Sequence, residues 1–117
     1  MNVINWTREI KPHIEKSNLI EKNSDNEEWF VTKEHLNGML SKICNMDYEL
    51  VVLGEYRRKA LRDLEKGIIL LNDYFLHDKK YLKLITKIHR WIGWVQGVLN
   101  GTKNSTLEEM KLINKNS

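Results

Sequence analysis

Two groups of basic, aromatic and polar side chains in this sequence have the chemistry to hold a small anionic ligand. The first group is Arg57, Arg58 and Arg62, and guanidinium groups bind phosphate through paired N–H donors. The second group also contains two glycines four residues apart, and its members are His89, Arg90, Gly93, Trp94, Gln96 and Gly97. An exposed tryptophan can stack on a nucleobase. Together these residue types indicate binding of a nucleotide rather than a reaction.

The two glycines of the second group predict a shallow trough on a helix. Gly93 and Gly97 are one helical turn apart, and neither carries a Cβ atom. Each glycine destabilises a helix by about 1 kcal/mol relative to alanine, so a pair in an apolar segment indicates a need for close approach. A second helix or a flat ligand would satisfy that need, and the sequence leaves both alternatives open.

Arg57 is the most unusual charged position, because it interrupts the apolar stripe of its predicted helix. A charge on such a stripe has to find a partner or leave the core. A buried carboxylate, a neighbouring subunit or a bound phosphate would each be a suitable partner. Among the tryptophans, Trp91 lies on an apolar stripe and is interpreted as a core residue, whereas Trp94 lies off it and fits an interface or a ligand contact.

Sequence motifs of enzymes are absent. The chain has no glycine-rich phosphate loop, no His-Glu-x-x-His motif and no nucleophile elbow. Its single cysteine, Cys44, forms neither a disulfide framework nor a zinc pattern and is interpreted as a small core residue. The carboxylates fall mainly on faces that we expect to be solvated. We therefore expect a protein without catalysis, metal site or cofactor.

The composition is that of an ordinary globular protein. A chain of 117 residues predicts one domain, 1–117, in which residues 1–30 could form a loosely attached leader. A domain of this size buries only about two thirds of its unfolded surface, which favours a homo-oligomer. The net charge of +3 permits anionic partners without demanding them. Because no apolar run is long enough to span a membrane and no secretion signal is visible, we expect a cytoplasmic protein.

Apolar spacing predicts an all-α helical bundle built on a long antiparallel αα-hairpin with shorter flanking helices. The two long helices are predicted over about 47–76 and 81–99, with a polar connection at residues 77–80. Antiparallel pairing would bring the two candidate groups near one another. A shorter helix is predicted from Thr32, a plausible N-cap, to about residue 45.

The ends of the chain carry weaker patterns. Near Pro12 we expect one short helix that begins or breaks at the proline. Residues 21–28 contain no apolar side chain and are predicted to form a loop or linker. Thr106 and Glu109 fit a capping box, which predicts a last short helix over about 107–114.

The segment Arg58-Lys-Ala-Leu-Arg-Asp-Leu-Glu-Lys-Gly-Ile-Ile-Leu-Leu-Asn72 resembles part of the helical hairpin in a family of small phage proteins. The shared features are an alanine, an acidic-Leu-Glu-x-Gly run and an apolar turn that ends in Leu-Asn. Proteins of that family sequester the cyclic nucleotide or cyclic ADP-ribose signals of the bacterial defence systems CBASS and Thoeris. A second segment, His89-Arg-Trp-Ile-Gly-Trp-Val-Gln-Gly with the later Thr-Leu-Glu-Glu-Met, is similar to the carboxyl end of uncharacterised small phage proteins.

The resemblance implies an oligomer that binds a cyclic nucleotide signal without catalysis in an infected bacterial cell. Aromatic side chains would stack on the bases, arginines would hold the phosphates, and the site would lie between subunits. Two alternatives stay open. The chain could inhibit a host complex through the surface of Gly93, Gly97 and Trp94, or it could be a nucleic-acid-binding module.

Overall fold

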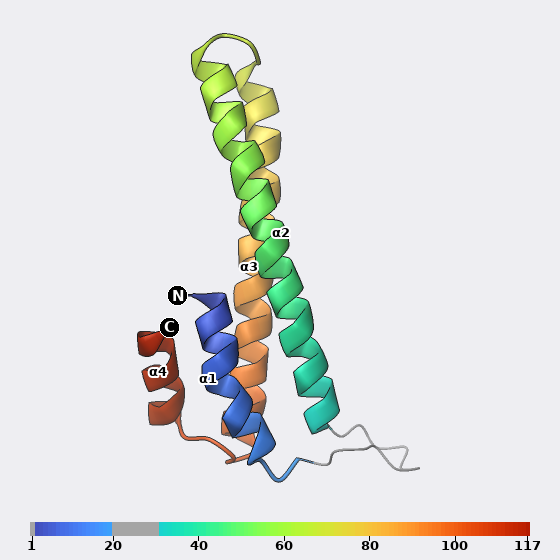
Figure 1. Ribbon diagram of the computed structural model, residues 1–117, viewed down its shortest axis with the longest axis vertical. Coiled ribbons are helices and arrows are strands. Elements are labelled where there is room, and N and C mark those ends of the chain that lie inside the picture. Colours follow the sequence, from blue (N-terminus) through green and yellow to red (C-terminus); the bar gives the residue numbers. More distant parts are fainter. Residues whose placement is uncertain (1, 20–30) are drawn as a thin grey trace. The chain divides into compact units, whose positions relative to one another are not determined.

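The computed structural model describes residues 2–19 and 31–117. In these ranges the chain forms four helices and no strand: α1 (Val3–Glu15), α2 (Lys33–Glu65), α3 (Leu71–Gly101) and α4 (Leu107–Asn116). The long helices α2 and α3 pack against each other as an antiparallel hairpin (Figure 1), so the predicted all-α bundle is confirmed. The loop predicted at residues 21–28 lies outside the described residues.

The chain contains two compact units, and both long helices contribute to each of them. The first unit contains residues 1–44 and 91–117, which include α1, α4, the start of α2 and the end of α3. The second unit contains residues 45–90 and consists of the remaining parts of α2 and α3 with the turn between them. We refer to this second unit as the hairpin unit.

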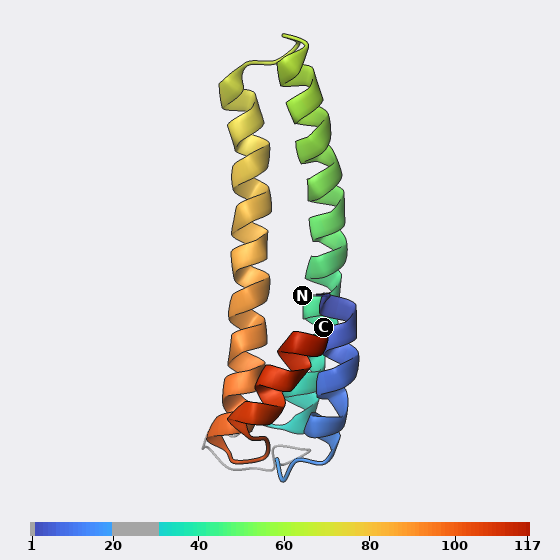
Figure 2. The ribbon, with the colours of Figure 1, turned by 90° about the vertical axis from the view of Figure 1, so that its left-hand side faces the viewer.

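The first unit has a continuous apolar core. Figure 2 shows α1 beside the first turns of α2, and α4 packs against α1. The buried residues of α1 recur every three or four positions, which is the spacing of one helix face. The apolar core of this unit consists of Val3, Trp6, Ile10, Ile14, Leu36, Leu40, Ile43, Ile92, Val95, Leu99, Met110 and Ile113. This core lets α1, which falls within the predicted leader, bury one whole face.

Helix α1 is continuous, so the prediction that it begins or breaks at Pro12 is wrong. The helix begins after Asn2, whose side-chain oxygen accepts a hydrogen bond of 3.0 Å from the Asn5 amide. Pro12 lies near the other end of α1 and is exposed. A proline there removes one backbone hydrogen bond, and the burial of the apolar face of α1 offsets that loss.

The turn of the hairpin lies at residues 66–70 and is set by a glycine. Gly67 has a φ of +73°, a left-handed conformation that glycine adopts without steric cost. Its amide donates to the Leu64 carbonyl at 3.0 Å, and the Ile68 amide donates to the Asp63 carbonyl at 2.8 Å. These two bonds satisfy two of the last four carbonyls of α2 and end the helix.

The predicted boundaries of the long helices are therefore wrong. Residues 47–76 are not one helix, because the chain reverses direction after Gly67 while apolar residues continue at helical spacing on both sides of it. Residues 77–80, predicted as the connection, belong to α3. The helix that begins after Thr32 does not stop near residue 45 but continues to Glu65. The predicted N-cap is confirmed, since Thr32 Oγ1 accepts a hydrogen bond of 3.0 Å from the His35 amide.

Helix α4 begins with the predicted capping box. Thr106 Oγ1 accepts from the Glu109 amide at 3.1 Å, and Glu109 Oε1 accepts from the Thr106 amide at 3.0 Å. On the neighbouring α1, His13 Nδ1 lies 3.5 Å from Glu109 Oε2 and 3.1 Å from Ser105 Oγ. The start of α4 is thus joined to α1 by polar contacts as well as by the apolar core.

The capping carboxylate should make the first unit sensitive to acid. The hydrogen bonds from the backbone and side chain of Thr106 lower the pKa of Glu109, and the charges of His13 and Lys16 lower it further. Because the folded pKa lies below the ordinary value of 4.5, this contribution to stability is present above that value and is lost as the pH falls through the folded pKa.

We expect Glu109→Gln to remove this part of the acid sensitivity, since glutamine can keep the cap but does not titrate. Thermal unfolding of both proteins between neutral pH and about pH 3 measures the difference. Glu108→Gln is the control, because Glu108 carries the same charge in the same turn and does not cap the helix. Equal loss of stability in acid for the wild type and Glu109→Gln would contradict the expectation.

Candidate functional site

The residues of the predicted site belong to two different units. Arg57, Arg58, Arg62, His89 and Arg90 lie in the hairpin unit, whereas Gly93, Trp94, Gln96 and Gly97 lie in the first unit. Each group has its own surroundings. In the hairpin unit the structure brings two of the predicted residues together in one hollow.

This hollow, of about 250 Å³, lies between α2 and α3 of the hairpin unit. Arg57 and Arg58 line it from α2, and two tyrosines, Tyr74 and Tyr81, line it from α3. Gly54 and Leu61 complete the lining, and we call these six residues the arginine–tyrosine hollow. The other predicted basic residues of this unit, Arg62, His89 and Arg90, are exposed and do not line it.

Three side chains of α3 hold Arg57 in place. Its Nε atom lies 2.8 Å from Asp78 Oδ1, and its guanidinium lies 4.8 Å from the centre of the Tyr81 ring, a cation–π contact. The hydrogen bond to Tyr74 is the strongest influence that raises the pKa of Arg57, and the Asp78 charge raises it further. The partner of the charge on the apolar stripe is therefore a carboxylate of the same chain.

The contact between Arg57 and Asp78 is an ion pair without an aligned hydrogen bond. Asp78 Oδ1 is buried and receives no hydrogen bond of good geometry from the described part of the chain, although the Arg57 Nε atom is close to it. The side chains of Arg57 and Asp78 are 36% and 23% exposed. Solvent screens such a pair only in part, so removing one partner leaves the other charge poorly compensated.

Arg58 is more available to a ligand than Arg57 is. Its guanidinium contacts Glu55 one turn earlier on α2, and both side chains are mostly exposed. Exposed ion pairs of this kind contribute little to stability, so an anionic ligand could replace the Glu55 carboxylate at small cost. The hollow is smaller than pockets for drug-sized ligands, which occupy roughly 300–1,000 Å³, and suits one ring or one phosphate of a larger molecule.

The residues of the second predicted group have different roles in the first unit. Trp94 is 42% exposed, and its ring meets the His35 ring edge-to-face with centroids 5.7 Å apart. The Gln96 amide donates to Asn114 Oδ1 of α4 at 2.6 Å. A Cβ atom added at Gly93 or Gly97 would meet no described atom within 4 Å. No described segment therefore uses the close approach that the two glycines offer.

Sequence reasoning missed Tyr74, Asp78 and Tyr81, which complete the surroundings of Arg57. Their spacing of four and three residues places them on one face of α3. The available signal was the position of Gly67 as the hairpin turn. Arg57 and Asp78 lie at nearly equal distances along the chain from this glycine, and so do Gly54 and Tyr81, as the two arms of an antiparallel hairpin require.

The fold and the hollow define an all-α helical-hairpin protein with a small basic and aromatic site on its hairpin. Comparisons with protein-family models, with curated proteins and with solved structures find no match to this chain. Among the described residues, no helix is long and apolar enough to cross a membrane. In the same ranges, no three histidine, cysteine or carboxylate side chains form a group that could hold a metal ion.

Proposed function

We propose that this protein binds a small anionic nucleotide, of the cyclic nucleotide or cyclic ADP-ribose type, and sequesters it without changing it chemically. The observation that carries the proposal is the arginine–tyrosine hollow. Its guanidinium groups would hold a phosphate, and its tyrosine rings would contact a base or ribose. The ligand would be an immune signal of a bacterial cell, removed from solution by a phage protein.

Two further features support a nucleotide ligand. Residues 45–90 contain ten lysines and arginines against seven aspartates and glutamates, so the hairpin unit alone has a net charge of +3. This charge attracts anions to the unit. Arg58 and Leu61 of the hollow also belong to the segment that resembles nucleotide-sequestering phage proteins.

The lining of the hollow supports binding rather than catalysis. A general acid or base needs a pKa near the working pH, and neither histidine nor a carboxylate lines the hollow. The two carboxylates that contact its arginines, Asp78 and Glu55, are engaged by Arg57 and Arg58. The guanidinium of Arg57 stays charged at neutral pH, and its raised pKa makes it a still weaker acid, so it does not serve as a general acid or base.

The test is the thermal stability of the purified protein with cyclic dinucleotides, cyclic trinucleotides and cyclic ADP-ribose isomers. A ligand that binds the folded state raises the melting temperature, and heat denaturation should release it intact, as measured by mass spectrometry. We expect Arg58→Gln to weaken binding about tenfold. The matched control is Arg62→Gln, which removes the same charge one turn later at an exposed position outside the hollow.

Several outcomes would contradict the proposal. No shift with any of the compounds would exclude a sponge for these signals, and equal weakening by Arg62→Gln would place the site outside the hollow. Chemical conversion of the ligand would indicate an enzyme. A host protein recovered in stoichiometric amounts in place of a nucleotide would support the inhibitor alternative, and strongly salt-dependent binding of DNA or RNA would support the nucleic-acid alternative.

A further inference from the structure

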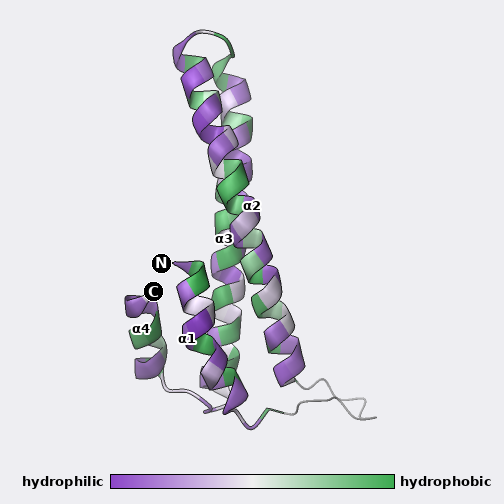
Figure 3. Ribbon diagram, viewed as in Figure 1, coloured by the Kyte–Doolittle hydropathy of each residue, from purple (hydrophilic) through white to green (hydrophobic). Residues whose placement is uncertain are grey.

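The hairpin unit leaves most of its large apolar side chains uncovered. All residues from 45 to 90 are described, and among them only Met46, Ala60 and Ile88 are buried apolar residues. Figure 3 shows that hydrophobic residues nevertheless continue along both helices to the turn. The exposed members are Tyr48, Val51, Val52, Tyr56, Leu61, Ile68, Leu70, Leu71, Phe75, Leu76 and Leu82. Apolar surface of this extent marks an interaction site.

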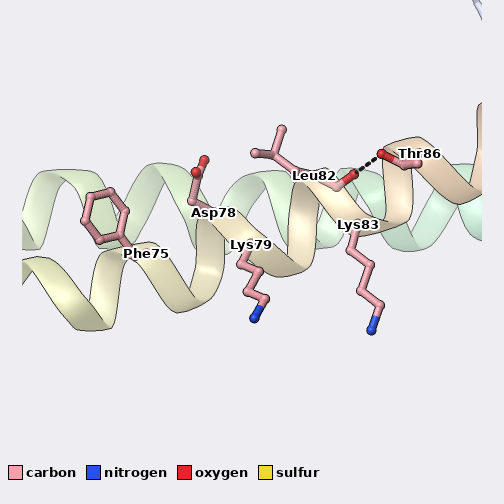
Figure 4. A pocket seen from close by; sticks show the side chains of 6 residues that line it. All are labelled: Phe75, Asp78, Lys79, Leu82, Lys83 and Thr86. Carbon is pink, nitrogen blue, oxygen red and sulfur yellow. Dashed lines mark hydrogen bonds between the residues drawn. The ribbon is translucent and has the colours of Figure 1, made fainter.

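One part of this surface is an open groove of about 540 Å³ along α3. Figure 4 shows its lining residues, with Leu82 and Asp78 on one side of the helix and Lys79 and Lys83 extending from the other. The six lining residues are Phe75, Asp78, Lys79, Leu82, Lys83 and Thr86. We call this surface the α3 groove.

The spacing of these residues matches the packing surface of a coiled coil. Residues 75, 78, 79 and 82 follow the pattern i, i+3, i+4 and i+7, and residues 79, 82, 83 and 86 repeat it one turn later. Four residues in this pattern form the hole that receives one side chain from a facing helix. The α3 groove therefore offers two successive holes centred four residues apart, and side chains three or four residues apart on a facing helix would fill both.

We propose that the occupant is a second copy of this chain, which places its own α3 antiparallel in the groove. Phe75 and Leu82 are seven residues apart and are themselves the apolar side chains of the groove. Consider a two-fold axis that is perpendicular to α3 and passes between Asp78 and Lys79. It places Phe75 of each copy opposite Leu82 of the other along the paired helices. The surface is thus complementary to itself, as a two-fold interface requires.

The charges of the groove select the antiparallel arrangement. With the axis between Asp78 and Lys79, the aspartate of each copy lies level with the lysine of the other. A parallel pair would instead set Lys79 against Lys79 and Lys83 against Lys83, and like charges in a desolvated contact are unfavourable. Asp78 keeps 23% of its side chain exposed beside Arg57, which leaves part of the carboxylate available to the second copy.

Pairing of two hairpins through the α3 groove would cover Phe75 and Leu82, which are 51% and 49% exposed, and would give each hairpin the four-helix surroundings that a two-helix unit lacks. The inference does not depend on the nucleotide proposal, because Phe75 and Leu82 do not line the arginine–tyrosine hollow.

The first test compares Leu82→Gln with Leu76→Gln by sedimentation velocity over a range of concentrations. Both leucines are exposed on α3, at 49% and 60%, but Leu76 does not line the groove. We expect the wild type to sediment as a dimer or a multiple of it, with the 13.9 kDa monomer as the unit. Leu82→Gln should weaken the association about tenfold or more, and Leu76→Gln should leave it within about twofold.

The second test uses charge and does not depend on apolar packing. Lys79→Glu would set a glutamate level with Asp78 of the other copy at two places in the dimer, so we expect weaker association that high salt partly restores. Lys80→Glu makes the same charge change on an exposed residue outside the groove and should have little effect. Circular dichroism of all four variants checks that they remain helical.

Three results would overturn the proposal. A wild type that is monomeric at all concentrations would exclude a second copy as the occupant of the groove. Equal weakening by the glutamine variants of Leu82 and Leu76 would place the contact elsewhere on the hairpin. Stronger association of Lys79→Glu than of Lys80→Glu would exclude the antiparallel arrangement.

Discussion

Trp6→Ala is expected to lower the free energy of unfolding of the first unit by about 3–5 kcal/mol. Trp6 is the largest of the fully buried side chains, with no exposed surface, and it lies on the apolar face of α1. Truncation to alanine removes its burial and leaves a cavity that the surrounding helices can fill only in part. Because small domains are stable by only about 5–15 kcal/mol, this single change would bring the first unit close to unfolding.

Trp6→Phe should be much less harmful than the lost volume alone suggests. Within the described part of the chain, the buried Nε1 group of Trp6 has no hydrogen-bond partner, and an unpaired buried donor is itself unfavourable. Phenylalanine removes this donor and keeps most of the apolar ring. Its smaller volume and the removal of the donor act in opposite directions, so the net loss should stay below about 2 kcal/mol.

Urea unfolding followed by circular dichroism measures both variants, and Trp94→Ala is the matched control. Trp94 is 42% exposed, so its truncation should change the stability by less than about 1 kcal/mol. A loss for Trp6→Ala no larger than that for Trp94→Ala would show that α1 is not part of the core in solution.

Helical periodicity predicted the fold class because apolar residues recur at helical spacing along most of the chain. The cap at Thr32 and the capping box at Thr106 and Glu109 were also predictable, since both depend on residues that are neighbours in sequence. The position of the hairpin turn was not. The apolar residues before and after Gly67 keep the same helical spacing. Periodicity alone therefore favours one long helix through the glycine.

That misplaced turn also limited the prediction of the site. With the connection at residues 77–80, Asp78 would have been a loop residue, and Tyr74 and Arg57 would have shared one helix. In the structure, Asp78 and both tyrosines instead lie on α3, opposite Arg57 across the hairpin. The arginines of the site were recognisable by residue type, but their partners follow from the antiparallel register, which a single glycine determines.

Variants of Arg57 and Asp78 should distinguish the contribution of this ion pair to stability from the contribution of Arg57 to ligand binding. Arg57→Met alone leaves the Asp78 carboxylate without its cation, and we expect a loss of about 1 kcal/mol after allowing for solvent screening of a partly exposed pair. Asp78→Leu alone should be less harmful, because Arg57 keeps its contacts with Tyr74 and Tyr81. The double variant removes both charges from an otherwise apolar stripe and should be about as stable as the wild type.

The same double variant should lose at least about tenfold in affinity for a nucleotide that shifts the wild-type melting temperature, because its hollow has lost one of two guanidinium groups. Urea unfolding of the wild type, the two single variants and the double variant gives the coupling energy of the ion pair. Ligand titration of the double variant then reports the function of Arg57 in a protein of normal stability. Full affinity in that variant would assign Arg57 to hairpin packing alone and leave Arg58 as the only phosphate-binding side chain of the hollow.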